Sequence, residues 1–261
     1  PMTAPVRVEI GPVSRIVLCR PDKHNAMTAE MGRLVTEAVH AVNAASEPRV
    51  VLIQGEGRAF CAGGDFSLIE ESSRKAPEQN RRDMIEFYSS FLAVARLRER
   101  SVAVLHGAAV GAGLCLAMAC DVRLAAAEAR LGANFVRVGL HPGMGCTVLL
   151  PRLVGPAKAS ELILTGKLIS GDEAARIGLV NVAVPRAALE EQVEAFTSAV
   201  VAAAPIAVAQ AKETLVAPLL AALEAGLERE AACQALDFST DDLKEAVRAF
   251  REGQSPTFRG A

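Results

Sequence analysis

The sequence predicts an α/β fold in which helices cover both faces of the central strands. Three short apolar runs, at residues 50–53, 102–105 and 122–125, have the length and composition of buried strands. Stretches with helical periodicity separate them, which gives the order β-α-β-α-β along this part of the chain. Because the runs are continuously apolar instead of alternating with polar residues, both faces of the sheet should be buried.

The other elements expected between residues 6 and 119 follow from local patterns. Residues 6–10 and 16–18 flank a Gly-Pro pair and should form a hairpin. A helix should follow Thr28, because apolar residues recur on one face after it. Helical sequence also extends to about residue 98, and residues 112–119 should form a buried helix because they are apolar all round.

Capping patterns organise the helical sequence that follows. Ser170 and Glu173 have the spacing of a capping box at the start of a short helix. Ser239 should cap the last helix, with Phe238 and Leu243 spaced as its hydrophobic staple.

We divide the chain into a core, residues 1–198, and a helical C-terminal region, residues 199–261. The C-terminal region is amphipathic and poor in aromatic residues, so its apolar face needs the core or another subunit to cover it. We therefore expect the chain to self-associate.

Composition excludes several classes of function. The 261 residues are 51% apolar and 22% charged, which supports a sizeable core and argues against disorder. A net charge of −2 gives no general attraction to nucleic acid or to an anionic membrane. The apolar stretches are interrupted before the ~20 residues that a membrane span needs, and we see no secretory signal. We therefore expect neither a nucleic-acid partner nor a membrane.

The six cysteines predict a reducing, cytoplasmic environment. They form no C-x-x-C pair, and four lie inside apolar runs, where cysteine is a small buried hydrophobe. The four histidines show no ligand spacing with them, so no metal site is expected.

Two glycine-rich segments are the most informative part of the sequence. A-F-C-A-G-G-D (59–65) and H-G-A-A-V-G-A-G-L-C-L-A-M-A-C-D (106–121) each follow a predicted strand and should open a helix. Free backbone N–H groups at such a helix start can bind negative charge. Two of them aimed at one point would form an oxyanion hole.

Four blocks, in order, resemble the crotonase, or enoyl-CoA hydratase/isomerase, superfamily. R-P-D-K-H-N-A-M (20–27) resembles its R-P-x-x-x-N-A-[LM] block, and the two glycine-rich segments resemble its oxyanion-loop signatures. Residues 139–155 resemble its G-[LI]-x-P-G-x-G-x-T-x-x-L-P-R-x-V-G block, and the similarity continues through 159–166 and 174–181. The blocks cover nearly the whole chain.

The resemblance implies a spiral of ββα units, followed by C-terminal helices that build trimers, often paired into hexamers. It implies that a coenzyme A thioester, or an acyl group on a carrier protein's pantetheine arm, is the substrate, with no further cofactor. Mapped onto this sequence, the backbone N–H groups of Gly64 and Ala112 hold the thioester oxygen. Ala112 stands where glycine is usual, but alanine keeps its N–H.

The two glutamates that activate water in hydratases of this family are replaced. The first falls at Cys115, and the second, in an F-G-x-P-E segment, falls at Phe135 after Asn134. Phenylalanine cannot transfer a proton, and a thiol with an unperturbed pKa near ~8.5 is mostly neutral. Acid–base catalysis of this kind contributes roughly 10² to 10⁴ in rate, so ordinary hydration is not expected.

Other groups are candidates for proton transfer. Cys115 should lie in the first turn of a helix, where the dipole lowers a thiol's pKa, although a buried space-filling role is the alternative. His141 lies on the loop whose Gly143 matches a glycine that helps to hold the hydratase water; a structural histidine is the alternative. Asp65 matches an aspartate that fixes the loop more often than it catalyses.

The resemblance assigns substrate recognition to further residues. Tyr88, the only tyrosine, falls in the helical stretch that usually lines the acyl pocket, with a core or surface position as the alternative. Coenzyme A should be bound by the first two blocks, and from an adjacent subunit by an aromatic–basic pair near the C-terminus: Lys23, Ala26, Ala62 and Phe66, and Phe258 with Arg259.

Three hypotheses of function result. The first is an enzyme that stabilises the enolate of an acyl thioester, with isomerase or decarboxylase chemistry ahead of hydration. The second is a non-catalytic acyl-CoA-binding protein that kept the pocket and lost the chemistry. The third, a hydrolase with Cys115 or Cys61 as nucleophile, ranks last because no histidine has a diagnostic spacing.

Overall fold

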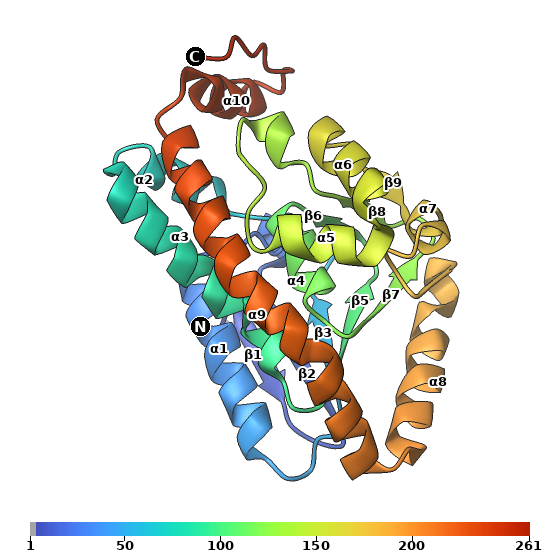
Figure 1. Ribbon diagram of the computed structural model, residues 1–261. Coiled ribbons are helices and arrows are strands. Elements are labelled where there is room, and N and C mark those ends of the chain that lie inside the picture. The colour runs from blue at the N-terminus through green and yellow to red at the C-terminus, as the bar shows by residue number, and fades with distance from the viewer. Residues whose placement is uncertain (1–3) are drawn as a thin grey trace.

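The computed structural model, described here for residues 4–261, consists of two β-sheets wrapped by helices (Figure 1). The larger sheet has the strand order β1-β2-β3-β5-β7-β10, in which only β1 and β2 pair antiparallel. Its strands are β1 (Val6–Glu9), β2 (Val13–Leu18), β3 (Val50–Gly55), β5 (Arg100–Leu105), β7 (Val122–Ala126) and β10 (Val182–Val184). The predicted hairpin and the three buried strands are confirmed.

A second sheet, of order β4-β6-β8-β9, runs beside the first. Its strands are β4 (Ala59–Cys61), β6 (Ala108–Val110), β8 (Arg130–Gly132) and β9 (Ile169–Ser170). Along the chain β4 follows β3, β6 follows β5, and β8 follows β7, and each such pair leads into a helix. The protein is therefore a spiral of ββα units, and the predicted α/β class is confirmed.

Helices cover these sheets and continue past them. They are α1 (Ala29–Ala44), α2 (Phe66–Ser72), α3 (Pro77–Leu92), α4 (Ala112–Met118), α5 (Cys146–Val154), α6 (Pro156–Thr165), α7 (Gly171–Arg176), α8 (Leu189–Ala202), α9 (Pro205–Asp237) and α10 (Asp241–Arg251). Four 3-10 turns join them: η1 (Pro21–Lys23), η2 (Ala93–Arg96), η3 (Phe135–Val138) and η4 (Arg186–Ala188). Every residue of α4 is buried, as its apolar sequence predicts.

One of the two predicted caps is present, and the helix predicted to follow Thr28 begins directly after it. Thr28 accepts a hydrogen bond from Met31 N at the start of α1, and Ser170 accepts one from Glu173 N at the start of α7. The prediction that Ser239 caps the last helix is wrong. Thr240 is the cap of α10, whereas the Ser239 hydroxyl donates to Leu236 O at the end of α9. The predicted staple of Phe238 and Leu243 is also wrong, because the staple positions move by one residue when Thr240 is the cap.

Helix α9 is the longest element, and it spans about 50 Å at 1.5 Å per residue. It runs diagonally along α3 (Figure 1). One 18-residue window of it has a mean hydropathy of 1.4 and is only 6% buried, so by length and composition alone it could cross a membrane. The expectation that every apolar stretch is interrupted before the ~20 residues of a membrane span did not identify α9. Its two ends nevertheless carry buried polar side chains that hold it to the core, which is how a helix of a folded domain packs.

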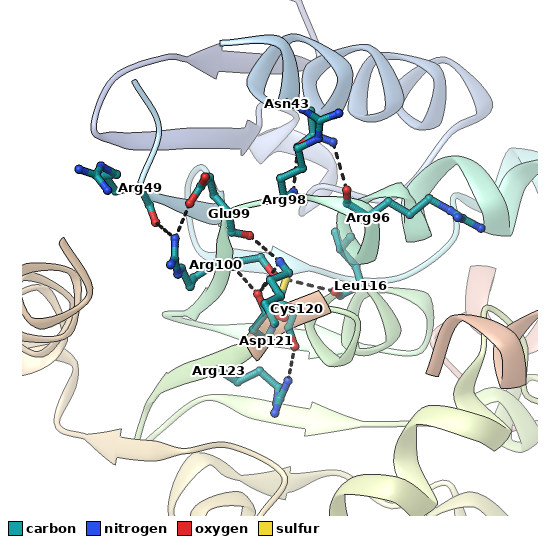
Figure 2. Close-up of polar contacts among 12 residues, drawn as sticks. Asn43, Arg49, Arg96, Arg98, Glu99, Arg100, Leu116, Cys120, Asp121 and Arg123 are labelled. Carbon is teal, nitrogen blue, oxygen red and sulfur yellow. Dashed lines mark hydrogen bonds and ion pairs between the residues drawn. The ribbon is translucent and has the colours of Figure 1, made fainter. Parts of the chain in front are cut away.

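One of these attachments lies where β5 and β7 begin. Lys212 Nζ of α9 is 2.7 Å from Asp121 Oδ2, and the Lys212 side chain is only 8% exposed. Asp121 also accepts from the backbone N–H of Ser101, which fixes the carboxylate. Figure 2 shows the neighbouring Arg100, which donates to Arg49 O, and Asp121 beside it. The N-terminal end of α9 is therefore tied to the amino ends of the parallel strands.

We predict that Lys212→Met lowers the free energy of unfolding by about 3 kcal/mol, because it leaves the Asp121 carboxylate without its cation. Denaturant unfolding measures this change. Lys244→Met is the matched control: it breaks an exposed pair with Asp241 on α10 and should change stability by less than about 0.5 kcal/mol. Equal effects of the two substitutions would contradict a stabilising role for the buried pair.

Candidate active site

The two glycine-rich loops emerge side by side because β4 and β6 are adjacent parallel strands. Ala59 pairs with Ala108, and Cys61 with Ala109. Parallel strands end at the same edge of a sheet, so the loops that follow them meet there. A Cβ built on Gly63 would lie 3.0 Å from Val110 O and 3.7 Å from Ala112 N, which places the loops in contact.

Glycine is required at two positions where these loops are in contact. Gly63 has φ +101°, a conformation that side chains rarely adopt. A Cβ on Gly113 would lie 2.3 Å from Cys61 O, so the first turn of α4 can rest on β4 only with glycine there. These two positions bring the start of α4 against the first loop.

The structure leaves both predicted donors with free N–H groups. Met27 N donates to Gly63 O, and Asp65 N donates to Met27 O. This bridge uses the carbonyl before Gly64 and the N–H after it, but not the Gly64 N–H. Ala112 is the first residue of α4, whose N–H has no partner within the helix. Neither amide has an acceptor among residues 4–261. Their role as an oxyanion hole stays a prediction.

Both donors line a cavity of about 230 Å³ whose walls are mainly apolar and aromatic. Five of the nine phenylalanines and the single tyrosine of the chain face it. These aromatic residues are Phe66, Phe87, Tyr88, Phe135, Phe238 and Phe250. Phe66 of α2 and Phe250 of α10 stack with ring centroids 4.0 Å apart, so the last helix contributes to the cavity wall.

No carboxylate, imidazole or cationic side chain of residues 4–261 lines this cavity. Phe135 and Asn134 lie on its wall beside Gly111, as the sequence alignment of the F-G-x-P-E segment predicts. Among the described residues of the wall, the Tyr88 phenol is the only ionisable group. Burial, together with the nearby Glu230 carboxyl, raises the pKa of Tyr88 well above its ordinary value. The described residues also contain no cluster of ligands suited to a metal ion.

The structure does not place Cys115 in the cavity. Its thiol is fully buried and donates to Gly143 O at 3.4 Å. Burial raises the pKa of Cys115 well above its ordinary value, with a further contribution from the neighbouring Cys146. The expectation that the helix dipole lowers this pKa is therefore wrong, because the penalty for burying a thiolate exceeds the favourable effect of one short helix.

His141 also lies outside the cavity lining. Its backbone N–H donates to Asp237 Oδ2 at 2.6 Å, and its ring Nδ1 is 2.6 Å from Pro142 O. The side chain thus faces its own loop, which fits the structural alternative better than proton transfer. Gly143, two residues further along the chain, lies against the Tyr88 hydroxyl.

The residues predicted to recognise the substrate fall into two groups. Ala62 and Phe66 line the cavity, and Asp65 caps α2 by accepting from Ser67 N at 3.1 Å, the loop-fixing role foreseen for it. Lys23 is exposed on η1, and the adjoining Ala26 accepts from Arg20 through its carbonyl.

Phe258 and Arg259 lie outside the cavity of their own chain, next to the start of α10. Arg259 N donates to Asp242 Oδ1 at 2.7 Å, and Phe258 is 39% exposed. Their predicted action from an adjacent subunit stays a prediction.

Sequence reasoning missed three polar residues on one face of α9. Glu230 accepts from Gly145 N and Thr147 N, and Asp237 accepts from His141 N. Gln234, between them, donates to His141 O at 2.6 Å. Burial raises the pKa of the Glu230 and Asp237 carboxyls despite these bonds. Their spacing of four and three residues in a mostly apolar helix was the available sign that this face is buried.

Comparison with known proteins agrees with this architecture. A sequence model described as enoyl-CoA hydratase/isomerase matches residues 10–261. The chain is 32% identical over 259 residues to the (E)-benzylidenesuccinyl-CoA hydratase of Thauera aromatica, covering 98% of this chain and all of that one. Among solved structures, an enoyl-CoA hydratase from Mycobacterium avium subsp. paratuberculosis superposes with a TM-score of 0.87 at 28% identity, covering 99% and 100% of the two chains.

A monofunctional enoyl-CoA isomerase from M. smegmatis is also similar, with a TM-score of 0.70 at 30% identity, covering 83% of this chain and 94% of that one. These matches extend across both sheets and the C-terminal helices. The chain belongs to the enoyl-CoA hydratase/isomerase family.

Proposed function

We propose that the protein is an enzyme that binds an acyl thioester and stabilises its enolate. The reaction that passes through this enolate is decarboxylation or double-bond isomerisation, not hydration. The thioester is carried on coenzyme A or on a pantetheine arm, and its oxygen lies between Gly64 N and Ala112 N. The observation that carries the proposal is a cavity with two free amide donors and no group in its wall that titrates near neutral pH. Water addition needs such a group to activate the water.

Decarboxylation fits this cavity better than isomerisation. The carbon–carbon bond to a β-carboxyl group breaks, its electron pair moves toward the thioester carbonyl, and neutral CO₂ leaves. The enolate then takes a proton from water, so no enzymatic base is required. A double-bond shift needs a base at the α- or γ-carbon. The apolar wall also disfavours a bound carboxylate relative to neutral CO₂.

The alternative is an acyl-CoA-binding protein without catalysis. Phe135 in the wall and the buried thiol of Cys115 favour it, because both positions have lost proton-transfer chemistry. The cysteine-nucleophile hypothesis loses support. Burial raises the pKa of Cys61 to about 12, and the Cys115 thiol is likewise kept neutral.

Self-association as a trimer or hexamer forms part of the proposal. Exposed apolar side chains along α9, including Ile206 and Leu215, support it because they need a covering surface. We expect light scattering of the purified protein to give the mass of three or six chains. A monomer at micromolar concentration would contradict this assembly.

We predict that malonyl-CoA or a substituted malonyl-CoA releases CO₂, while hydration of crotonyl-CoA is slower than in a two-glutamate family member by roughly 10² or more. Incubation with enoyl-, malonyl- and glutaconyl-CoA esters, followed by mass spectrometry of the thioesters, tests this. Binding without turnover across the panel would establish the non-catalytic alternative. Rapid hydration of crotonyl-CoA would overturn the preferred chemistry.

Ala112→Pro removes one proposed donor with little other change, because proline is tolerated at the first position of a helix. We expect turnover to fall by about 10² to 10³, with a change in unfolding free energy within about 1 kcal/mol. Ala29→Pro, at the first position of α1 and outside the cavity, is the matched control and should leave turnover unchanged. Turnover of Ala112→Pro within threefold of wild type would remove Ala112 N from the mechanism.

A further inference from the structure

The acyl cavity contains one polar pair whose purpose the proposed chemistry does not explain. Tyr88 of α3 donates to Gln234 Oε1 of α9 at 2.6 Å, and Gln234 Nε2 donates to His141 O. Both side chains are at least 96% buried from bulk solvent, and both line the cavity.

This pair has hydrogen-bonding capacity left over. An amide nitrogen carries two hydrogens and a phenol oxygen carries lone pairs, so one N–H of Gln234 and the acceptor side of the Tyr88 oxygen have no partner among residues 4–261. Buried polar groups without partners are costly. A ligand oxygen that accepts the free N–H of Gln234 would therefore gain affinity beyond what the aromatic wall provides.

The pair also lies at a chemically relevant place. A Cβ on Gly143 would lie 2.5 Å from the Tyr88 oxygen and 2.7 Å from Gln234 Nε2, so both polar atoms rest on the Gly143 backbone. Cys115, at the position of the first lost glutamate, contacts the carbonyl of the same glycine. Neutral hydrogen-bonding groups thus lie beside the point where a carboxylate would otherwise act.

Resting on the thioester binding proposed above, we infer that Tyr88 and Gln234 form a subsite that selects acyl groups bearing an oxygen atom on the β-carbon, as a carboxyl or keto group. Gln234 donates its free N–H to that oxygen, and Tyr88 orients the Gln234 amide by donating to its Oε1. Because both groups are neutral, they orient a carboxyl group without the strong stabilisation that a buried cation would give it. They determine specificity and transfer no proton.

Two thioesters that cannot lose CO₂ test the subsite without turnover. Butyryl-CoA and acetoacetyl-CoA differ in the oxygen on the β-carbon, and calorimetry measures their dissociation constants. We expect wild-type protein to bind acetoacetyl-CoA about fivefold to tenfold more tightly, as one added hydrogen bond allows. Tyr88→Phe and Gln234→Met should each reduce this preference at least threefold and leave butyryl-CoA affinity within twofold.

Ser90→Ala is the matched control, because it removes a hydroxyl from the same helix outside the acyl cavity. It should keep the wild-type preference. Equal binding of the two thioesters by wild type, or an unchanged preference in both cavity variants, would overturn the subsite and leave thioester binding intact. Failure of both thioesters to bind would overturn the proposed function and the subsite together.

Discussion

The parallel pairing of β4 with β6 is the constraint on which the candidate site depends. It forces two loops about 50 residues apart in the sequence to leave the sheet at one edge. The close contact of Gly113 with Cys61 O then sets the depth at which α4 begins. Two amides without internal acceptors result from this geometry, because a helix start and a strand end both leave N–H groups unused. The donors are thus a property of the backbone, and a side chain such as that of Ala112 can change without removing them.

Helix α9 fixes the opposite wall. Its Glu230 holds Gly145 N and Thr147 N, and these bonds fasten a loop in which Met144 has a left-handed φ of 58°. Such a conformation in a residue with a side chain persists only where surrounding contacts overdetermine it. Removing a buried carboxylate from water is unfavourable, and its raised pKa reflects that, yet three hydrogen bonds from the loop offset much of the penalty. The C-terminal helices therefore shape the cavity.

Local patterns predicted what local interactions determine. The strands, the helix after Thr28 and the cap at Ser170 follow from hydrophobic runs and from side chains a few residues away. The cap at Thr240 was missed because Ser239 and Thr240 are equally suited by type, and the end of α9 decides between them. The Tyr88–Gln234 pair joins residues 146 positions apart, so no spacing reveals it. The sequence left two environments open for Cys115, an active helix start and a buried space-filling position, and the packing of distant neighbours around the thiol decides for the second.

The aromatic wall, to which the described residues contribute no carboxylate or imidazole, also strengthens the electrostatic effect of the two amides. In a site of low polarity, an amide dipole interacts more strongly with developing negative charge than it would in water. In the proposed decarboxylation, negative charge would move from a carboxylate in an apolar region to a thioester oxygen held by two fixed donors. The family resemblance implies that Phe135 stands where hydratases have a glutamate, and a carboxylate in this wall would repel the migrating charge. In the proposed chemistry, a wall whose described residues include no carboxylate therefore disfavours hydration and favours an anionic transition state for the same reason.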